Sequence, residues 1–246
     1  MISKNRLKEL AAYRLQKRCD EEGVFVVEGP KLAAEALASG FAIRTVCATA
    51  EWKAESGMWG EYYEVSQAEL ERLSNFKSPN QVWMLVEREQ RAEVGERRSE
   101  FVLALDRVQD PGNVGTMLRT ADWFGIRHVV CSRDTASCYN PKVVQASMGA
   151  VFRTRVEYVD LAEWLAASGL PVYGASLQGR PFTELEKPAR GVLVIGNESA
   201  GISEAVMRQV THPVLIPNVG GTAESLNASV AAGILMCELG VGSYEL

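Results

Sequence analysis

The sequence FVLALDRVQDPGNVGTMLRTADWFGIRHVVCS, residues 101–132, contains the unit that decides the fold. Its first and last segments, 101–106 and 128–132, are short apolar runs, which predict buried strands. Between them, a turn at Pro111 precedes a predicted helix at about 113–125. A strand, a helix and a second strand in this order predict two parallel strands joined by a helical crossover.

The same alternation continues along the rest of the chain. The pattern predicts helices near 140–148 and over 161–168, 202–209 and 223–239, and strands over 155–159, 171–176, 191–196 and 212–217. Strands that alternate with helices imply a largely parallel sheet with helices on both faces. The predicted fold class is therefore α/β with a mostly parallel sheet.

A second, smaller α/β domain is predicted before this one. After a basic helix come predicted strands at 24–29, 43–49 and 81–86 and predicted helices at 30–39 and 66–73. The segment EREQRAEVGERRSE, residues 87–100, is charged and nearly free of large apolar side chains, which is typical of a connector. We therefore predict a small domain at 1–90, a linker at 91–100 and a larger domain at 101–246.

Composition restricts the class of protein. The chain has 246 residues, 47% of them hydrophobic and 23% charged, so both domains can build cores. No apolar run reaches the roughly 18 residues of a membrane helix, and MISKNRLKEL lacks the apolar core of a signal peptide. These features predict a cytoplasmic protein.

Cysteine and histidine positions give no indication of a metal site. The five cysteines are dispersed, which predicts reduced thiols rather than a disulfide framework. His128 and His212 are far apart in sequence and neither has the spacing of a metal ligand, so we expect both to be structural and no metal to be bound.

Net charge is −5, which by itself argues against nucleic acid as a partner. The first 20 residues differ from this average, because they carry six cations against Glu9 and Asp20. Such a stretch either contacts phosphates or forms a solvated helix face, and charge alone does not decide between them. The candidate RNA-binding residues are Lys4, Arg6, Lys8, Arg14, Lys17 and Arg18.

Several common ligand motifs are missing from the sequence. It has no G-x-G-x-x-G, no phosphate-binding P-loop, no G-x-S-x-G and no H-E-x-x-H. Instead, three polar segments with glycines each follow a predicted strand. In open α/β sheets, ligands bind at the ends of strands.

The first segment is DRVQDPGNVGTMLRTADWFGI, residues 106–126. Asp106 ends a strand, and Asn113 can cap the helix that follows. Arg119 lies on an early turn of that helix, where it can converge with Asn113 on one ligand. The alternative is a capped surface helix with a solvated arginine.

The second segment is VLVIGNESAGIS, residues 192–203. Glu198 lies between two loop glycines, Gly196 and Gly201, which allow a ligand to approach the main chain closely. A plain strand–turn–helix connection with Ser203 as its cap is an equally acceptable interpretation.

The third segment is LIPNVGGTAESLNASVAAGI, residues 215–234. A double glycine precedes a predicted helix that carries Ser225, Asn227 and Ser229. Capping alone needs fewer polar side chains than these three, so the pattern favours a functional role.

Together and in this order, the three segments resemble the SpoU/TrmH family of RNA ribose 2′-O-methyltransferases of the SPOUT superfamily. The resemblance rests on NVGTMLRTA at 113–121, IGNESAG at 195–201 and IPNVGGTAESLNASVA at 216–231. Asn218 stands where a methionine is common, Ala228 replaces a frequent valine, and the third loop is slightly longer than usual. SKNRLKEL and VFVVEGPKLAAEAL also resemble the opening of a ribosomal-protein-like RNA-binding domain found in many such enzymes.

The resemblance implies S-adenosylmethionine as cofactor, a C-terminal trefoil knot, and a homodimer whose sites use both subunits. It implies that Arg119 contacts the ribose 2′-hydroxyl and that Asn113 and Glu198 position the site. Ser225 and Asn227 would hold the ribose or catalytic partners. The implied cofactor-binding residues, largely through main-chain atoms, are Ile195, Gly196, Gly201, Ile216, Leu226 and Ser229.

The RNA substrate stays open at this point. The additional N-terminal domain favours ribosomal RNA over transfer RNA. A base-methylating enzyme and a non-catalytic RNA-binding or ribosome-assembly protein that retains the fold are the alternatives.

Overall fold

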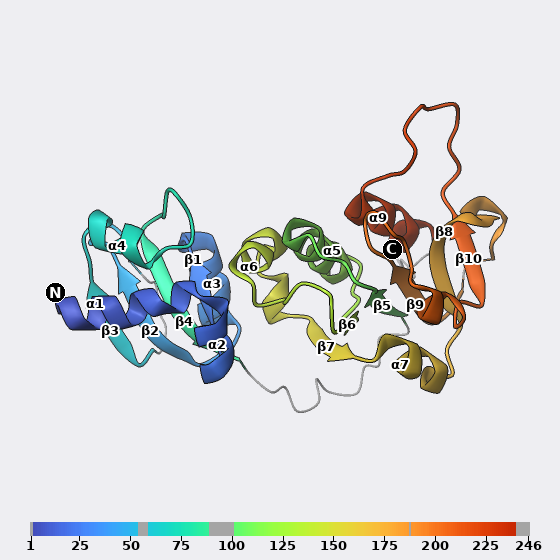
Figure 1. The fold of residues 1–246 in the computed structure, drawn as a ribbon. Coiled ribbons are helices and arrows are strands. Elements are labelled where there is room, and N and C mark those ends of the chain that lie inside the picture. Colours follow the sequence, from blue (N-terminus) through green and yellow to red (C-terminus); the bar gives the residue numbers. More distant parts are fainter. Residues whose placement is uncertain (1, 54–58, 89–100, 187, 240–246) are drawn as a thin grey trace. The chain divides into compact units, whose positions relative to one another are not determined.

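The computed structural model describes residues 2–53, 59–88, 101–186 and 188–239, so the predicted linker 91–100 lies outside the described residues. The chain forms two compact units. The first contains the described parts of 1–92 together with 139–152, and the second contains the described parts of 93–138 and 153–246. Figure 1 labels the helices and strands of both units.

The first unit contains a four-stranded sheet in the order β1–β4–β2–β3. Strands β1 and β2 both run antiparallel to β4, and the exposed edge strand β3 runs parallel to β2. The strands are β1 Val24–Glu28, β2 Ile43–Ala48, β3 Glu61–Glu64 and β4 Val82–Glu87. The helices are α1 Lys4–Ala11, the 3-10 turn η1 Ala12–Arg14, α2 Gln16–Glu22, α3 Pro30–Ala38 and α4 Gln67–Leu73.

Both faces of this sheet are buried, as the alternation along β4 indicates. Trp83 and Leu85 pack in a core with the side chains of α1, α2 and α4. Met84 and Val86 point to the opposite face, where they pack in a second core with α3. A sheet that is apolar on both faces needs a cover on each side.

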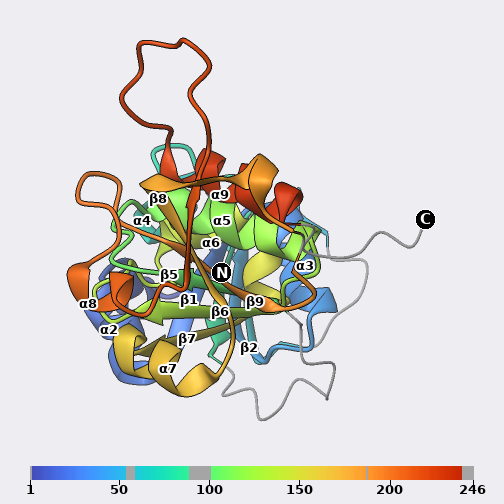
Figure 2. The same ribbon diagram turned by 90° about the vertical axis from the view of Figure 1, so that its right-hand side faces the viewer.

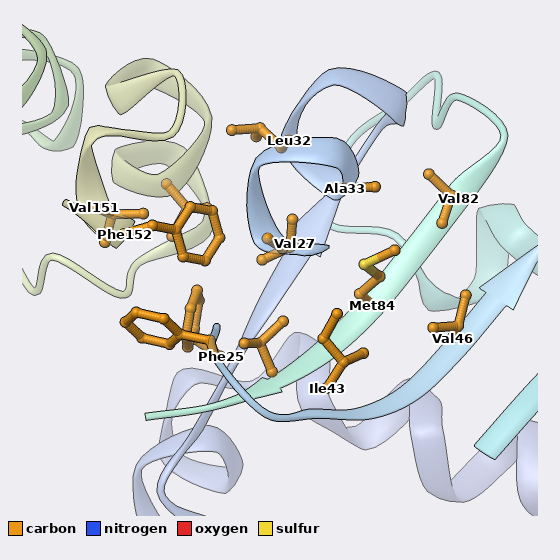
Figure 3. Packing of buried hydrophobic residues seen from close by; sticks show 14 of the residues in the cluster. Phe25, Val27, Leu32, Ala33, Ile43, Val46, Val82, Met84, Val151 and Phe152 are labelled. Atoms are coloured by element: carbon orange, nitrogen blue, oxygen red, sulfur yellow. The ribbon is translucent and has the colours of Figure 1, made fainter. Parts of the chain in front are cut away.

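Residues 139–152 complete the cover of the second face, although they lie beyond the linker in sequence. They form α6 Pro141–Ser147 and the 3-10 turn η2 Ala150–Phe152. The ring of Phe152, 1% exposed, lies 5.3 Å from that of Phe41 and 5.9 Å from that of Phe25. Figure 3 shows Val151 and Phe152 projecting into this cluster. This segment therefore belongs to the core of the first unit.

The second unit is built on a six-stranded sheet in the order β10–β8–β9–β5–β6–β7. Every neighbouring pair is parallel, which confirms the predicted mostly parallel α/β fold. The strands are β5 Phe101–Leu105, β6 His128–Ser132, β7 Arg155–Val159, β8 Val172–Pro181, β9 Gly191–Ile195 and β10 His212–Leu215.

Helices cover both faces of this sheet. Helices α7 Leu161–Ser168 and α8 Glu204–Met207 pack on one face against alternate residues of β5, β6, β8 and β9. Figures 1 and 2 show α5 Pro111–Trp123 and α9 Ala228–Glu238 together on the opposite face. A third short 3-10 turn, η3 Phe182–Glu184, follows β8. No described helix has the length and apolar character needed to cross a membrane.

The predicted helix at 223–239 is wrong at its start. Helix α9 begins at Ala228, because the Asn227 side chain caps it by accepting hydrogen bonds from the N–H groups of Ser229 and Val230. The segment before Asn227 is a loop that extends away from the second unit in both views (Figures 1 and 2). Ser225 therefore lies on this loop and not on the helix.

We expect Phe152→Ala to destabilise the first unit by about 3–5 kcal/mol, because it leaves a cavity in an aromatic cluster. Chemical unfolding followed by tryptophan fluorescence measures the loss. Leu15→Ala is the matched control, since Leu15 is 68% exposed and its loss changes stability by about 0.5 kcal/mol or less. A Phe152→Ala protein as stable as the control would contradict the assignment of 139–152 to this core.

Candidate active site

The carboxyl ends of three neighbouring strands form the edge of the sheet that carries the polar segments. Strand β5 lies between β9 and β6, and all three run in the same direction. The segment after β5 leads into α5, and the segment after β9 contains Glu198. Helix α9 packs against α5, which brings the third segment to the same edge.

One chain of side-chain hydrogen bonds joins the three segments. Asn113 donates from Nδ2 to Glu198 Oε1 over 2.9 Å. Its Oδ1 accepts from Asn227 Nδ2, also over 2.9 Å. Asn113 is 8% exposed, so both ends of its amide are used where few other partners are available.

Asn113 is free for this role because it does not cap α5. The capping residue is Asp110, whose side chain accepts from the N–H of Asn113, and Pro111 occupies the first turn. The sequence interpretation of Asn113 as the cap is therefore wrong. The Asp110-Pro111 pair is the signal that could have located the cap at Asp110, three residues before Asn113.

The loop after β9 is shaped by its glycines and by Asn197. A Cβ atom on Gly196 would lie 2.3 Å from the main chain of Gly201 and Ile202, so only glycine fits there. Gly201 has a φ of +68°, which glycine adopts without strain. Asn197 Oδ1 accepts from two N–H groups within the loop, and its Nδ2 donates to the Arg107 carbonyl oxygen over 2.9 Å. Sequence reasoning missed Asn197, for which the pattern gives no signal.

Arg119 is exposed on α5, six positions after Asn113. It takes no part in the Asn113–Glu198–Asn227 hydrogen-bond chain. Because its side chain is exposed, Arg119 is accessible to a bound substrate.

A cavity of about 460 Å³ lies between β8, β10, the loop 216–227 and the start of α9. Ile216, Ser225 and Leu226 line it together with apolar side chains such as Leu177 and Leu235. This volume is typical of a small-molecule site. Among the described residues, four others with a predicted cofactor role are not part of its lining: Ile195, Gly196, Gly201 and Ser229.

The structure distributes the six predicted RNA-binding residues over α1, η1 and α2, and three of them face carboxylates. Arg6 pairs with Glu9 and Glu61, Arg18 pairs with Glu22, and Lys17 lies 3.9 Å from Glu21. Lys4, Lys8 and Arg14 are exposed.

Two families of known proteins match the two parts of the chain. Residues 100–237 match the SpoU rRNA methylase family. The chain belongs to this family. Residues 4–83 match the MRM3-like substrate binding domain. The predicted family membership is therefore confirmed.

Similar proteins span nearly the whole chain. The 23S rRNA (guanosine(2553)-2′-O)-methyltransferase RlmP of Bacillus subtilis is 31% identical over 95% of each chain. A TrmH-family RNA methyltransferase structure from Porphyromonas gingivalis is 37% identical, with a TM-score of 0.87 over 97% of this chain and 98% of the other. An AdoMet-bound rRNA methyltransferase from Sinorhizobium meliloti is 28% identical, with a TM-score of 0.83 over 100% and 97%.

Introducing a negative charge at Asn113 tests the hydrogen-bond chain. Asn113→Asp replaces the donor to Glu198 with a second carboxylate, and we expect a loss of about 1–2 kcal/mol at pH 7 after solvent screening. Urea unfolding at pH 7 measures the loss.

The paired variant Asn113→Asp with Glu198→Gln restores a donor opposite an acceptor and should recover most of the lost stability. Glu204→Gln is the control for loss of an exposed carboxylate elsewhere in the unit, since Glu204 pairs with the exposed Arg208 at the end of α8. If the paired variant were as unstable as the sum of the single changes, the Asn113–Glu198 contact would not have the importance assigned to it.

Proposed function

We propose that the protein transfers a methyl group from S-adenosylmethionine to a ribose 2′-hydroxyl of RNA, with ribosomal RNA as the substrate. The observation that carries this proposal is the hydrogen-bond chain of Asn113, Glu198 and Asn227, which gathers three separated segments at one sheet edge. RlmP, which spans nearly the same length, is a 23S rRNA 2′-O-methyltransferase, and this favours ribosomal over transfer RNA.

The residues present fit the cofactor. The cavity lined by β8, β10 and the loop 216–227 is mostly apolar and large enough for a drug-sized molecule. Ile216 and Leu226 form part of its wall. Gly196 lets the loop 197–201 turn back against the end of β9, because a Cβ atom there would lie 2.3 Å from the main chain of Gly201 and Ile202. This proposal also includes main-chain contacts from Ile195, Gly201 and Ser229 to the cofactor.

S-adenosylmethionine supplies an electrophilic methyl group when bound. The ribose hydroxyl is a poor nucleophile until its proton is removed, so the protein must align it and provide for that proton. In this proposal Arg119, which is exposed on α5, contacts the hydroxyl. Because arginine stays protonated, Arg119 orients the hydroxyl and a neighbouring RNA phosphate, and that phosphate accepts the proton.

The other polar residues act by positioning. Asn113, Glu198 and Asn227 hold the ends of β5, β9 and α9 in register, so that the ribose meets a rigid surface. Ser225, on the loop that lines the cavity, is available to hold the ribose from the opposite side.

Two further features belong to this proposal: a trefoil knot at the C-terminal end and a homodimer whose sites use both subunits. Trp123 is 83% exposed on α5, and Val230 is 50% exposed on α9. These helices pack together, and Arg119 and Trp123 are four residues apart on one helix face. Burial of such side chains by a second copy would complete the site around Arg119. RNA as the substrate would place the protein in the cytoplasm.

Arg119→Ala tests the central role of this side chain. With labelled S-adenosylmethionine and ribosomal RNA from cells that lack the enzyme, we expect wild-type transfer and a loss of at least about 100-fold in the variant, because alignment of the nucleophile is lost. Arg119→Lys should recover little, since lysine lacks the planar fork that contacts two groups at once.

The control is Arg190→Ala, an exposed arginine at the opposite edge of the sheet. Transfer to transfer RNA alone would favour the tRNA alternative. Cofactor binding by calorimetry without methylation of any RNA would favour the non-catalytic alternative. An Arg119→Ala protein as active as wild type would contradict the proposed mechanism.

A further inference from the structure

Two arginines follow neighbouring strands at the same edge of the sheet as Glu198. Leu105 pairs with Cys131 in the parallel register of β5 and β6. Arg107 and Arg133 each follow two positions later, and the Arg107 N–H donates to the hydroxyl of Ser132, the residue before Arg133, over 2.8 Å. Helix α5 and the third segment supply other parts of the site, but neither arginine has a role in the hydrogen-bond chain described above.

The backbone of Arg107 is held in a conformation that arginine rarely adopts. Its φ is +58°, in the left-handed region, where a non-glycine residue is strained. Two hydrogen bonds impose this conformation: the Arg107 N–H donates to Ser132 Oγ over 2.8 Å, and its carbonyl oxygen accepts from Asn197 Nδ2 over 2.9 Å. Asn197 also lies 3.4 Å from Glu198 Oε2, which places Arg107 next to the candidate active site.

Further contacts join the two arginine-bearing loops into one rigid element. The Ala136 N–H donates to the Val108 carbonyl oxygen over 2.9 Å. Thr135 Oγ1 donates to the Leu105 carbonyl oxygen over 3.0 Å and lies 3.1 Å from Ser132 Oγ. The main-chain positions of Arg107 and Arg133 are therefore fixed by these hydrogen bonds.

The guanidinium of Arg107 has unused hydrogen-bonding capacity. Its Nε is buried and has no hydrogen-bond partner among the described residues. The carboxylate of Asp106 is 3.8 Å away, beyond hydrogen-bond distance, and its Oδ2 accepts from the Ser203 N–H over 2.5 Å. The Arg107 side chain is 37% exposed, so the head group is accessible to a ligand.

A glycine at position 107 would adopt this φ without strain. The backbone conformation therefore does not explain why residue 107 is an arginine, and we attribute the choice to a role of its side chain. Strain of this kind persists where the surroundings impose it, and it concentrates at functional sites.

We propose that Arg107 and Arg133 together bind a backbone phosphate of the RNA beside the nucleotide that is methylated. A guanidinium matches a phosphate through two parallel hydrogen bonds. The other charged side chains in the loops after β5, β6 and β9 at this edge, Asp106, Asp110, Asp134 and Glu198, are acidic and repel RNA, so the approach of a phosphate requires cations here.

This inference rests on the proposed function, and its test uses the full-length protein. RNA binding and steady-state methyl transfer are measured on 23S ribosomal RNA transcribed in vitro, over a series of potassium chloride concentrations. The variants are Arg107→Gly, Arg107→Lys and Arg133→Gln, with Arg190→Gln at the opposite edge as the control. Cofactor affinity is measured separately by calorimetry.

We expect Arg107→Gly to raise the KM for RNA roughly tenfold and to leave cofactor affinity unchanged. The slope of log affinity against log salt should fall in magnitude by about 0.7–0.9, the value for one lost phosphate contact. Arg133→Gln should act in the same direction, and Arg107→Lys should recover part of the loss. Because glycine relieves the strained φ, Arg107→Gly should unfold at the wild-type temperature or above it, which separates loss of binding from loss of fold.

Unchanged RNA affinity and salt slope in Arg107→Gly and Arg133→Gln, with wild-type transfer intact, would overturn this inference alone. A fall in cofactor affinity with unchanged RNA binding would overturn it in favour of the cofactor carboxylate. If the wild type bound this RNA but methylated no RNA, the proposed function would fail, and the salt slopes would still decide whether the arginines bind phosphate.

Discussion

The side-chain amide of Asn113 is the interaction on which the rest of the site depends. It donates to Glu198 and accepts from Asn227, residues 85 and 114 positions further along the chain. An ionised Asp has no donor for Glu198 and Leu has neither group, so neither could make both bonds with Glu198 and Asn227. The two bonds fix the ends of β5, β9 and α9 against one another at the edge of an otherwise apolar unit.

The parallel sheet explains why polar groups can gather there. Its central strands β5 and β9 are buried along their whole length, so their hydrogen-bonding groups are satisfied inside the sheet and exposed only at the strand ends. The loops that leave β5, β6 and β9 then hold one another through Ser132 and Asn197. A rigid edge of this kind is suited to aligning a weak nucleophile, for which small errors in position are costly.

Periodicity predicted most strands and helices of the second unit, because apolar runs of the right length identify buried strands. It failed at the start of α9, where Ser225 and Asn227 were included in the predicted helix but belong to a loop that Asn227 ends as a cap. It also gave no indication that Phe152 packs with Phe25, since pattern describes what is buried and not against which partner. The charge pattern identified the basic stretch in residues 1–20. It could not show that Arg6 pairs with Glu61, because Glu61 lies 55 residues further along the chain, on β3.

The central claim is that the three segments form one site for methyl transfer to a ribose hydroxyl. The most direct measurement is the position of the label after reaction of the wild-type protein with methyl-labelled S-adenosylmethionine and unmodified ribosomal RNA, followed by digestion to nucleosides. The account predicts that the label is found in a single 2′-O-methylated nucleoside. Label in a methylated base, or no label in any RNA, would contradict it.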